Sequence, residues 1–162
     1  MIKPFIQLAA VLIFLTGCQP EEQTVEMEKA PLQQLDSEEN GLSISLRKVT
    51  DSELTIVIQN GRNIDFTYGR PFRIEQRIDN VWYVLPFNED GSAFEDIKLL
   101  AGPRKQTIET VSLSQLADPL VPGDYRIVKS FSAFSINEQG AGVDGEAFWL
   151  AAPFKKEAIR SE

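Results

Sequence analysis

Short stretches of alternating hydrophobic and polar residues dominate the chain from about residue 41 onward. Residues 42–46 (LSISL) have an apolar residue at every second position, which is the period of a strand with one buried face. Residues 54–58 (LTIVI) are rich in β-branched side chains and are followed by the turn-forming pair Asn60-Gly61. We predict a β-strand in each stretch.

The next alternating stretches predict a β-hairpin. Residues 72–78 (FRIEQRI) place Phe72, Ile74 and Ile78 on one face and charged side chains on the other. Asp79-Asn80 is a two-residue turn signal, and the apolar run 81–85 (VWYVL) follows it directly. We therefore predict that these two stretches pair as neighbouring antiparallel strands.

The second half of the chain alternates between strand patterns and irregular stretches. The pattern predicts an irregular segment in residues 86–100, a polar edge strand in 105–113 and one helical turn in 114–117. It then predicts a strand in residues 124–131, a Gly-, Ser- and Asn-rich loop in 132–145 and a last strand in 146–154. No amphipathic helix separates successive strands, which argues against a parallel α/β sheet.

These elements predict an all-β fold of about seven strands. Residues 120–125 (LVPGDY) look like a tyrosine corner, in which a tyrosine near the start of a strand bonds through its hydroxyl to backbone upstream. Pro122, Gly123 and Tyr125 are therefore expected to have a structural role. We predict an immunoglobulin-like antiparallel Greek-key β-sandwich.

A family resemblance points the same way. The positions that carry it are Tyr68-Gly69, Phe72, Ile74-Glu75, Trp82, Leu85-Pro86, Gly123, residues 125–129 (YRIVK) and residues 147–150 (AFWL). Together they resemble a bacterial immunoglobulin-like domain family that occurs in secreted lipoproteins of Bacillus-type organisms, mostly without an assigned activity. The resemblance covers roughly residues 41–155 and implies the fold. The chain differs from antibody-type domains because it lacks both core cysteines.

The N-terminus has the organisation of a secretory signal. Lys3 is followed by an apolar run in residues 5–15 (FIQLAAVLIFL), which is too short to span a bilayer as a mature helix. Residues 15–18 (LTGC) then resemble the lipobox of bacterial lipoproteins, whose cysteine is acylated, with palmitate-like chains, and becomes the mature N-terminus. We expect Cys18, the only cysteine, to be lipidated; the alternative is an inert cysteine in an ordinary signal peptide.

The lipobox predicts an extracytoplasmic protein anchored to the outer leaflet of the cell membrane, or to the outer membrane in an organism that has one. Residues 19–40 carry seven acids against Lys29 alone and show little apolar periodicity, which predicts a flexible acidic spacer, although a short helix in residues 32–39 is an alternative. The sequence thus predicts four parts: a lipoprotein signal peptide in residues 1–17, the lipidated cysteine with its linker in 18–40, the sandwich in 41–155 and a C-terminal tail in 156–162.

Composition excludes several kinds of chemistry. The chain has no histidine, which removes the commonest general base, and a single cysteine rules out an intramolecular disulfide. Its net charge of −8 argues against binding to nucleic acid. We expect no catalytic residue, no metal site and no cofactor. Two alternatives remain: Ca²⁺ held by the acidic loop 88–96, and a small hydrolase using carboxylates among Glu89, Asp90, Asp96 and Glu109.

Binding to another molecule of the cell envelope, a protein or a polymer, is the function that we predict. Two surfaces are candidates: the aromatic group Trp82, Tyr83 and Phe87, and the loop that contains Phe134 and Asn137. One of Trp82 and Tyr83 is expected to fill the core and the other to be exposed, because neighbouring strand residues point to opposite faces. The alternatives are that both rings are covered and that the loop is only flexible. Arg70, Arg73, Arg77 and Lys129 are expected to pair with Glu75 and nearby acids on a sheet face.

Overall fold

Two antiparallel β-sheets packed face to face form the domain. The structure is a computed structural model, and it describes residues 27–158. The larger sheet has the strand order β1 (Glu28–Lys29), β7 (Val81–Val84), β6 (Arg73–Ile78), β10 (Gly123–Ile136), β5 (Asp65–Tyr68) and β8 (Leu99–Ala101), and β11 (Gly142–Lys156) pairs with the other edge of β10. The smaller sheet has the order β2 (Glu38–Glu39), β3 (Leu42–Val49), β4 (Glu53–Asn60) and β9 (Gln106–Ser112).

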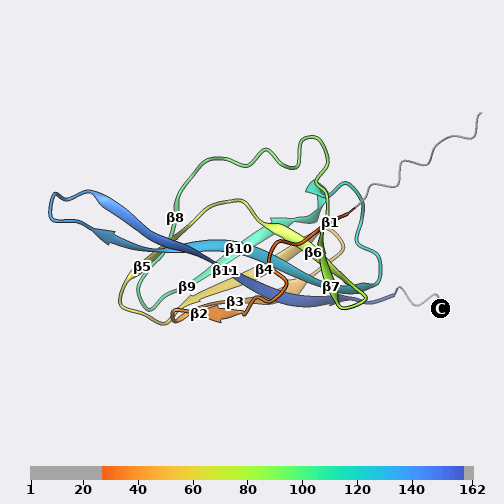
Figure 1. The fold of residues 1–162 in the computed structure, drawn as a ribbon, viewed down its shortest axis with the longest axis horizontal. Helices are drawn as coiled ribbons and strands as arrows, with labels where there is room; N and C mark the ends of the chain where they lie inside the picture. The colour runs from red at the N-terminus through yellow and green to blue at the C-terminus, as the bar shows by residue number, and fades with distance from the viewer. Residues whose placement is uncertain (1–26, 159–162) are drawn as a thin grey trace, which may run out of the picture.

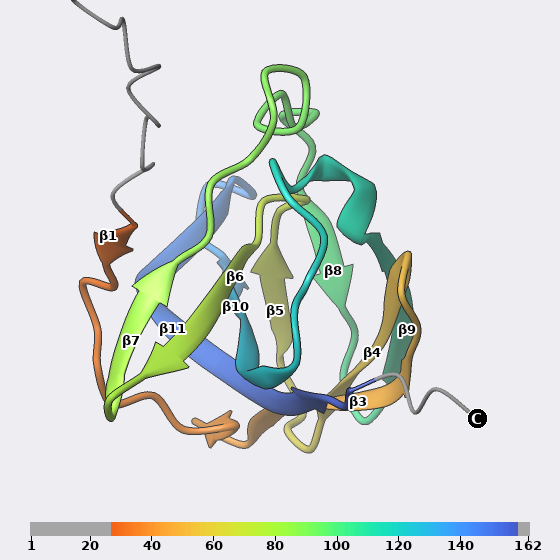
Figure 2. The ribbon, with the colours of Figure 1, turned by 90° about the vertical axis from the view of Figure 1, so that its right-hand side faces the viewer.

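The core lies between these sheets (Figure 2), and strand alternation supplies it. Leu54, Ile56 and Ile58 of β4 are fully buried and belong to the same core cluster as Tyr125 and Ile127 of β10. Side chains that point inward from both sheets are removed from water together, which stabilises the sandwich by about 25 cal/mol per Å² of apolar surface buried. The predicted all-β sandwich is thus confirmed, with eleven strands in residues 27–158 where the sequence predicted about seven.

Several local predictions are also confirmed. Strands β6 and β7 pair as a hairpin through Asp79 and Asn80, whose φ angles of 48° and 64° are those of a two-residue turn with left-handed backbone. Strand β9 forms the edge of the smaller sheet, as its polar sequence suggested. The helical turn is η1 (Leu113–Gln115), and the side chain of Ser112 caps it by accepting a hydrogen bond from the Ser114 backbone.

The segment 132–145 differs from the predicted loop. Strands β10 and β11 continue their pairing up to Ile136 and Gly142, so only residues 137–141 form a turn. A bulge sets two residues, Gly145 and Glu146, opposite Ala133, and this irregularity disrupts the two-residue period that would reveal a strand. Two further strands, β5 and β8, were not predicted because they are only four and three residues long.

Residues 27–40 also differ from the prediction of a flexible linker. Strand β1 pairs with β7, strand β2 pairs with β3, and Ala30 between them is 3% exposed. Within these residues the structure has no helix in 32–39. The domain therefore begins before residue 41, the predicted boundary. The remainder of the predicted linker, residues 18–26, and the signal segment lie outside the described residues.

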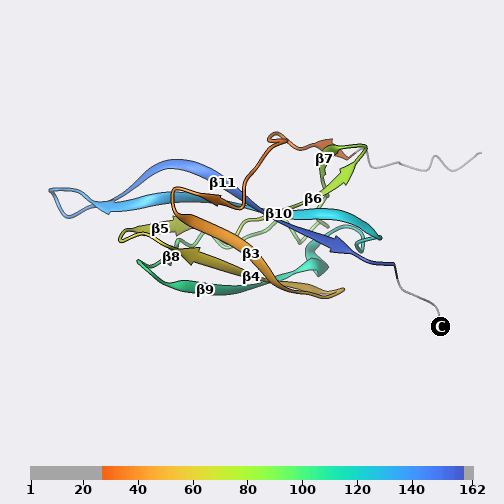
Figure 3. The same ribbon diagram turned by 90° about the horizontal axis from the view of Figure 1, so that it is seen from below.

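The elements are arranged along one long axis. The turn between β10 and β11 projects beyond β5, β8 and β9 at the left of Figures 1 and 3, whereas β1 lies toward the opposite end. The registers agree, because Glu28 lies beside Val84, Val84 beside Glu75, and Glu75 beside Arg126 near the start of β10. From Arg126 to Ile136 the strand rises about 33 Å at ~3.3 Å per residue. The chain thus enters the domain at one end, and the hairpin extends from the other.

Candidate functional site

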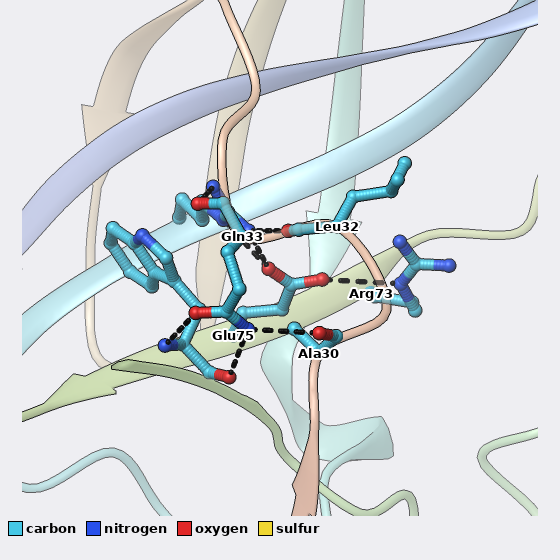
Figure 4. A network of polar contacts seen from close by, with 7 residues as sticks. Ala30, Leu32, Gln33, Arg73 and Glu75 are labelled. Atoms are coloured by element: carbon cyan, nitrogen blue, oxygen red, sulfur yellow. Dashed lines mark hydrogen bonds and ion pairs between the residues drawn. The ribbon is translucent and has the colours of Figure 1, made fainter. Parts of the chain in front are cut away.

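An N-terminal strap, which we define as residues 30–36, crosses the outer face of the larger sheet (Figure 4). The Gln33 amide donates to the backbone carbonyls of Ala30 and Trp82, at 2.8 and 3.0 Å, and its oxygen accepts from the Trp82 backbone at 2.9 Å. Arg126 donates to the carbonyls of Leu32 and Gln33 at 2.5 and 3.2 Å. These bonds attach the strap to β7 and β10 by specific contacts with the backbone.

Beneath the strap lies a buried ion pair between β6 and β10. Glu75 is fully buried and accepts a 2.6 Å hydrogen bond from Arg126 Nε and a 3.3 Å bond from Arg73 Nε. The Arg126 guanidinium lies 4.4 Å from the centre of the Trp82 ring, and that of Arg73 lies 4.5 Å from the Trp149 ring. Arginine stacks well on aromatic faces, so each guanidinium is held on two sides.

Trp82 and Tyr83, two of the predicted binding residues, are both half-buried, and neither belongs to the core between the sheets. The prediction that one of them fills the core is therefore wrong. Trp82 faces outward but lies under Arg126, whereas the sequence had suggested a free aromatic surface. The alternative, in which the rings are covered, is correct for Trp82. Arg126 and the strap cover this ring, whereas the sequence had suggested the segment that follows Phe87.

Phe87, the third aromatic candidate, packs inside the domain. Its ring contacts Phe72 and Phe94 edge to face, with centroids 5.4 and 5.5 Å away. The three rings pack against the edge of the core, where aromatic pairs of this geometry are favourable. Phe87 is thus part of the packing that attaches the connection between β7 and β8 to the sandwich.

Lys129 lies in the core and not on a sheet face, so the prediction for this lysine is wrong. Its side chain is fully buried, and Nζ donates to the Gly69 carbonyl at 3.0 Å and to Glu109 Oε1 at 3.4 Å. Burial lowers the pKa of Lys129, and the charge of Glu109 acts in the opposite direction. Because Glu109 belongs to β9, this ion pair joins the two sheets.

The tyrosine corner is present. Tyr125 is buried, and its hydroxyl donates a 2.6 Å hydrogen bond to the carbonyl of Val121, four residues upstream. Gly123 fits the same turn, since a Cβ there would lie 3.3 Å from Gln76 Nε2 and 3.5 Å from the tyrosine ring. Burial raises the pKa of the Tyr125 hydroxyl. Its function is to fix the turn into β10, as the sequence predicted.

We expect Tyr125→Phe to lower the free energy of unfolding by about 1 kcal/mol, since it leaves the Val121 carbonyl without its donor and keeps the ring in place. Denaturant unfolding of the full chain would measure this change. Tyr83→Phe is the matched control, because this half-buried tyrosine makes no side-chain hydrogen bond within residues 27–158. Equal losses in the two variants would contradict a special role for the corner.

The projecting hairpin contains the other two predicted binding residues. Phe134 lies over Gly142, where an added Cβ would come within 2.7 Å of the phenylalanine ring. Asn137 shapes the turn: its side-chain oxygen accepts hydrogen bonds from the backbone of Gln139 and Ala141 at 3.1 and 2.9 Å. Asn137 is therefore a turn-forming residue, and a flexible loop, the alternative for this segment, does not describe it.

The base of the hairpin is fixed by Asp144, which sequence reasoning missed. Its two carboxylate oxygens accept hydrogen bonds from Lys98 at 2.5 Å and from the Thr67 hydroxyl at 2.7 Å. The hydrogen bond from Lys98 has the larger effect and that from Thr67 the smaller, and together they hold the pKa of Asp144 below its usual value. Beyond this point the side chains are open to solvent, and Ile136 and Val143 are 66% and 43% exposed.

The rest of the described chain has few other features that suggest a functional site. A pocket of about 340 Å³ lies beside the tyrosine corner, between Met27, Leu85 and Leu120. Residues 27–158 contain no group of three potential metal ligands among Asp, Glu, His and Cys. No helix in the same range is long and apolar enough to cross a membrane.

Comparison with known proteins agrees with the fold. Residues 38–155 match the family described as bacterial Ig-like domain, which is well over half of the chain. The protein therefore belongs to the bacterial Ig-like domain family. The match begins at strand β2, close to the predicted boundary, and ends within β11. A search of curated proteins found no match.

Proposed function

We propose that this Ig-like domain protein is an extracytoplasmic lipoprotein, anchored to the membrane through Cys18, and that its domain is a binding or accessory module of the cell envelope. The β10–β11 hairpin would be the surface that contacts the partner. The observation that carries this proposal is the exposure of Ile136 and Val143 on a hairpin that extends beyond the sandwich. The two side chains point to opposite faces of the hairpin, because Val143 lies opposite Ser135 and Ile136 lies opposite Gly142, so each face of this projecting element presents one exposed apolar side chain to a partner.

The arrangement of the domain supports this role. The described chain starts at β1, at the end of the sandwich far from the hairpin tip. If Cys18 carries the lipid, eight residues lie between it and Met27, and the nine fully extended steps from Cys18 to Met27 span about 30 Å. The membrane would then lie near the β1 end, and the hairpin would point away from the bilayer, accessible to other envelope molecules.

A hydrolase is the rival hypothesis, and it requires two carboxylates facing each other across a cleft. Glu109 lies in the core with Lys129, whereas Glu89, Asp90 and Asp96 are exposed on the connection between β7 and β8. This separation favours a binding module over an enzyme. A purely structural subunit of another envelope protein remains an alternative, and it predicts co-purification with one defined protein.

Substitution at two places would test the proposal. Cys18→Ser should move the protein from the membrane fraction to the soluble fraction, because the sulfur that carries the lipid is lost; a variant that stays in the membrane fraction would contradict the anchor. Chemical crosslinking of the full chain in cell envelopes should give a defined adduct that Ile136→Asp together with Val143→Asp abolishes.

Ile108→Asp is the control for the hairpin variant, since Ile108 is 49% exposed on β9. It should leave the adduct unchanged. If the adduct persists in the hairpin variant and disappears in the control, the partner contacts the smaller sheet and the hairpin assignment is wrong.

A further inference from the structure

One edge of the hairpin has no partner strand. Strand β11 pairs with β10 along its whole length, but within residues 27–158 no strand pairs with its opposite edge. The strap contacts that edge at one point, where the Ala151 backbone donates a 3.0 Å hydrogen bond to the carbonyl of Asp36. From Gly142 to Leu150 the edge continues into the hairpin. A long open strand edge is a template for an additional strand.

The bond of Ala151 identifies the backbone groups that face outward. In a strand, alternate residues direct their N–H and C=O groups to the same edge. The pairing of β10 with β11 is regular between Ala147 and Ala151, so Ala147 and Trp149 direct their N–H groups to the open edge, as Ala151 does. Ala147 is exposed, so little side-chain bulk blocks an incoming backbone at this position.

The charge of the hairpin indicates what kind of strand would bind. Residues 132–149 contain Glu138, Asp144 and Glu146 and no base. Lys98 pairs with Asp144 only, and Glu138 and Glu146 form no ion pair within the described chain. A second copy of this protein would add the same acids to one ladder, and like charges placed opposite each other are destabilising. A basic strand would instead gain cross-strand charge pairs.

We propose that the open edge of β11, from Gly142 to Leu150, binds an extended basic segment of a partner protein as an added β-strand. This inference depends on the proposed binding function and specifies its partner. Backbone hydrogen bonds to Ala147 and Trp149 hold the segment, and its lysine or arginine side chains lie near Glu138 and Glu146. In this kind of recognition the backbone hydrogen bonds accept many partner sequences, and the charges of the side chains select among them.

A synthetic peptide tests the inference with the full chain purified in detergent. The probe is a nine-residue peptide in which lysine alternates with valine and threonine, and the comparison peptide has glutamate in place of each lysine. We expect saturable binding of the basic peptide alone, with slower hydrogen exchange at the amides of Ala147 and Trp149. Equal binding of both peptides, or unchanged exchange at both amides, would overturn the proposal.

Two variants separate backbone pairing from charge. Ala147→Pro removes the outward N–H and should weaken peptide binding about tenfold or more, whereas Ala147→Ser keeps the N–H and should bind like the wild type. Glu146→Lys keeps the backbone and should also weaken binding, so the charge requirement is testable even if the proline variant is poorly folded. Equal affinities of the Pro and Ser variants, both folded, would exclude strand addition.

The result also separates this inference from the function on which it rests. If the crosslinked adduct depends on Ile136 and Val143 while Ala147 and Glu146 variants bind the peptide normally, the partner contacts the hairpin tip and the edge proposal fails alone. If the chain protects the Ala147 and Trp149 amides by self-association without peptide, the occupant of the edge is a second copy, and the basic partner is excluded.

Discussion

A Lys129→Met variant is expected to lose about 3–5 kcal/mol of unfolding free energy, because it leaves the buried carboxylate of Glu109 without its main partner. Glu109 Oε2 already has no hydrogen-bond partner, so the carboxylate depends on the contacts of Oε1. Arg70 is the other cation nearby, but it is 3.9 Å away and 45% of its side chain is exposed. Denaturant unfolding of the purified protein measures the loss.

The double variant Lys129→Met with Glu109→Leu distinguishes the ion pair from simple packing. Replacing both charges by apolar side chains of similar size removes the desolvation cost, so the double variant should recover most of the stability. Lys48→Met is the surface control: Lys48 pairs with Glu53 while 61% of its side chain is exposed, and the expected change is below about 1 kcal/mol. A double variant that is no more stable than Lys129→Met would contradict this explanation.

The pH dependence of the same comparison has a defined sign. Burial lowers the pKa of Lys129 in the folded protein below the usual 10.5. Between these two values the unfolded chain binds more protons than the folded one, so this lysine makes the folded state more stable as the pH rises. The wild type should therefore gain stability relative to the double variant as the pH approaches 10.5.

Lys129 also shows where prediction from sequence reaches its limit. Alternation located β3, β4, β6 and β7 and one turn motif located the corner at Tyr125, because these features depend on residues close in the sequence. In residues 125–129 both faces of the strand carry a base, so hydrophobicity does not identify the inner face. The partner of Lys129 is Glu109, on a strand of the other sheet. Only the packed structure brings the two together.

The strap was missed for a related reason. Its composition is that of a flexible segment, and composition correctly describes how little apolar surface it buries. What holds the strap are directed bonds from Gln33 and Arg126, and Arg126 lies more than ninety residues further along the chain. The hairpin was partly predictable, because its residues were selected as a binding candidate. Its sequence predicts a loop because the bulge interrupts the alternation of a strand and because the turn shaped by Asn137 is rich in loop-forming residues.

Glu75→Gln is expected to be the other strongly destabilising change, by about 3–5 kcal/mol, although the two side chains have nearly the same shape. The amide removes the negative charge between Arg73 and Arg126 and directs an N–H₂ group or a neutral oxygen toward them. Arg126 is then a buried cation without a counter-ion. Arg77→Gln on the same strand is the control. Arg77 is exposed, its one side-chain hydrogen bond within residues 27–158 goes to Asn80, and its guanidinium lies as far as 5.9 Å from the centre of the Trp82 ring, so this variant should change stability by less than about 0.5 kcal/mol.

The same variant tests whether the ion pair holds the strap. Arg126 contacts Glu75 through Nε and Nη2, both 2.6 Å from the carboxylate, and its two terminal nitrogens bond to the strap carbonyls. Loss of the carboxylate therefore frees the guanidinium to move away from Leu32 and Gln33. The amide of Trp82, which donates to Gln33, should then exchange faster than the lower global stability alone predicts, and trypsin should cleave sooner after Lys29. Gln33→Ala should accelerate the same two reactions with a smaller loss of stability, because it removes the strap bonds and leaves the ion pair intact. If Glu75→Gln lowers global stability while Trp82 exchange follows it without excess, the strap is held by Gln33 independently of the charges beneath it.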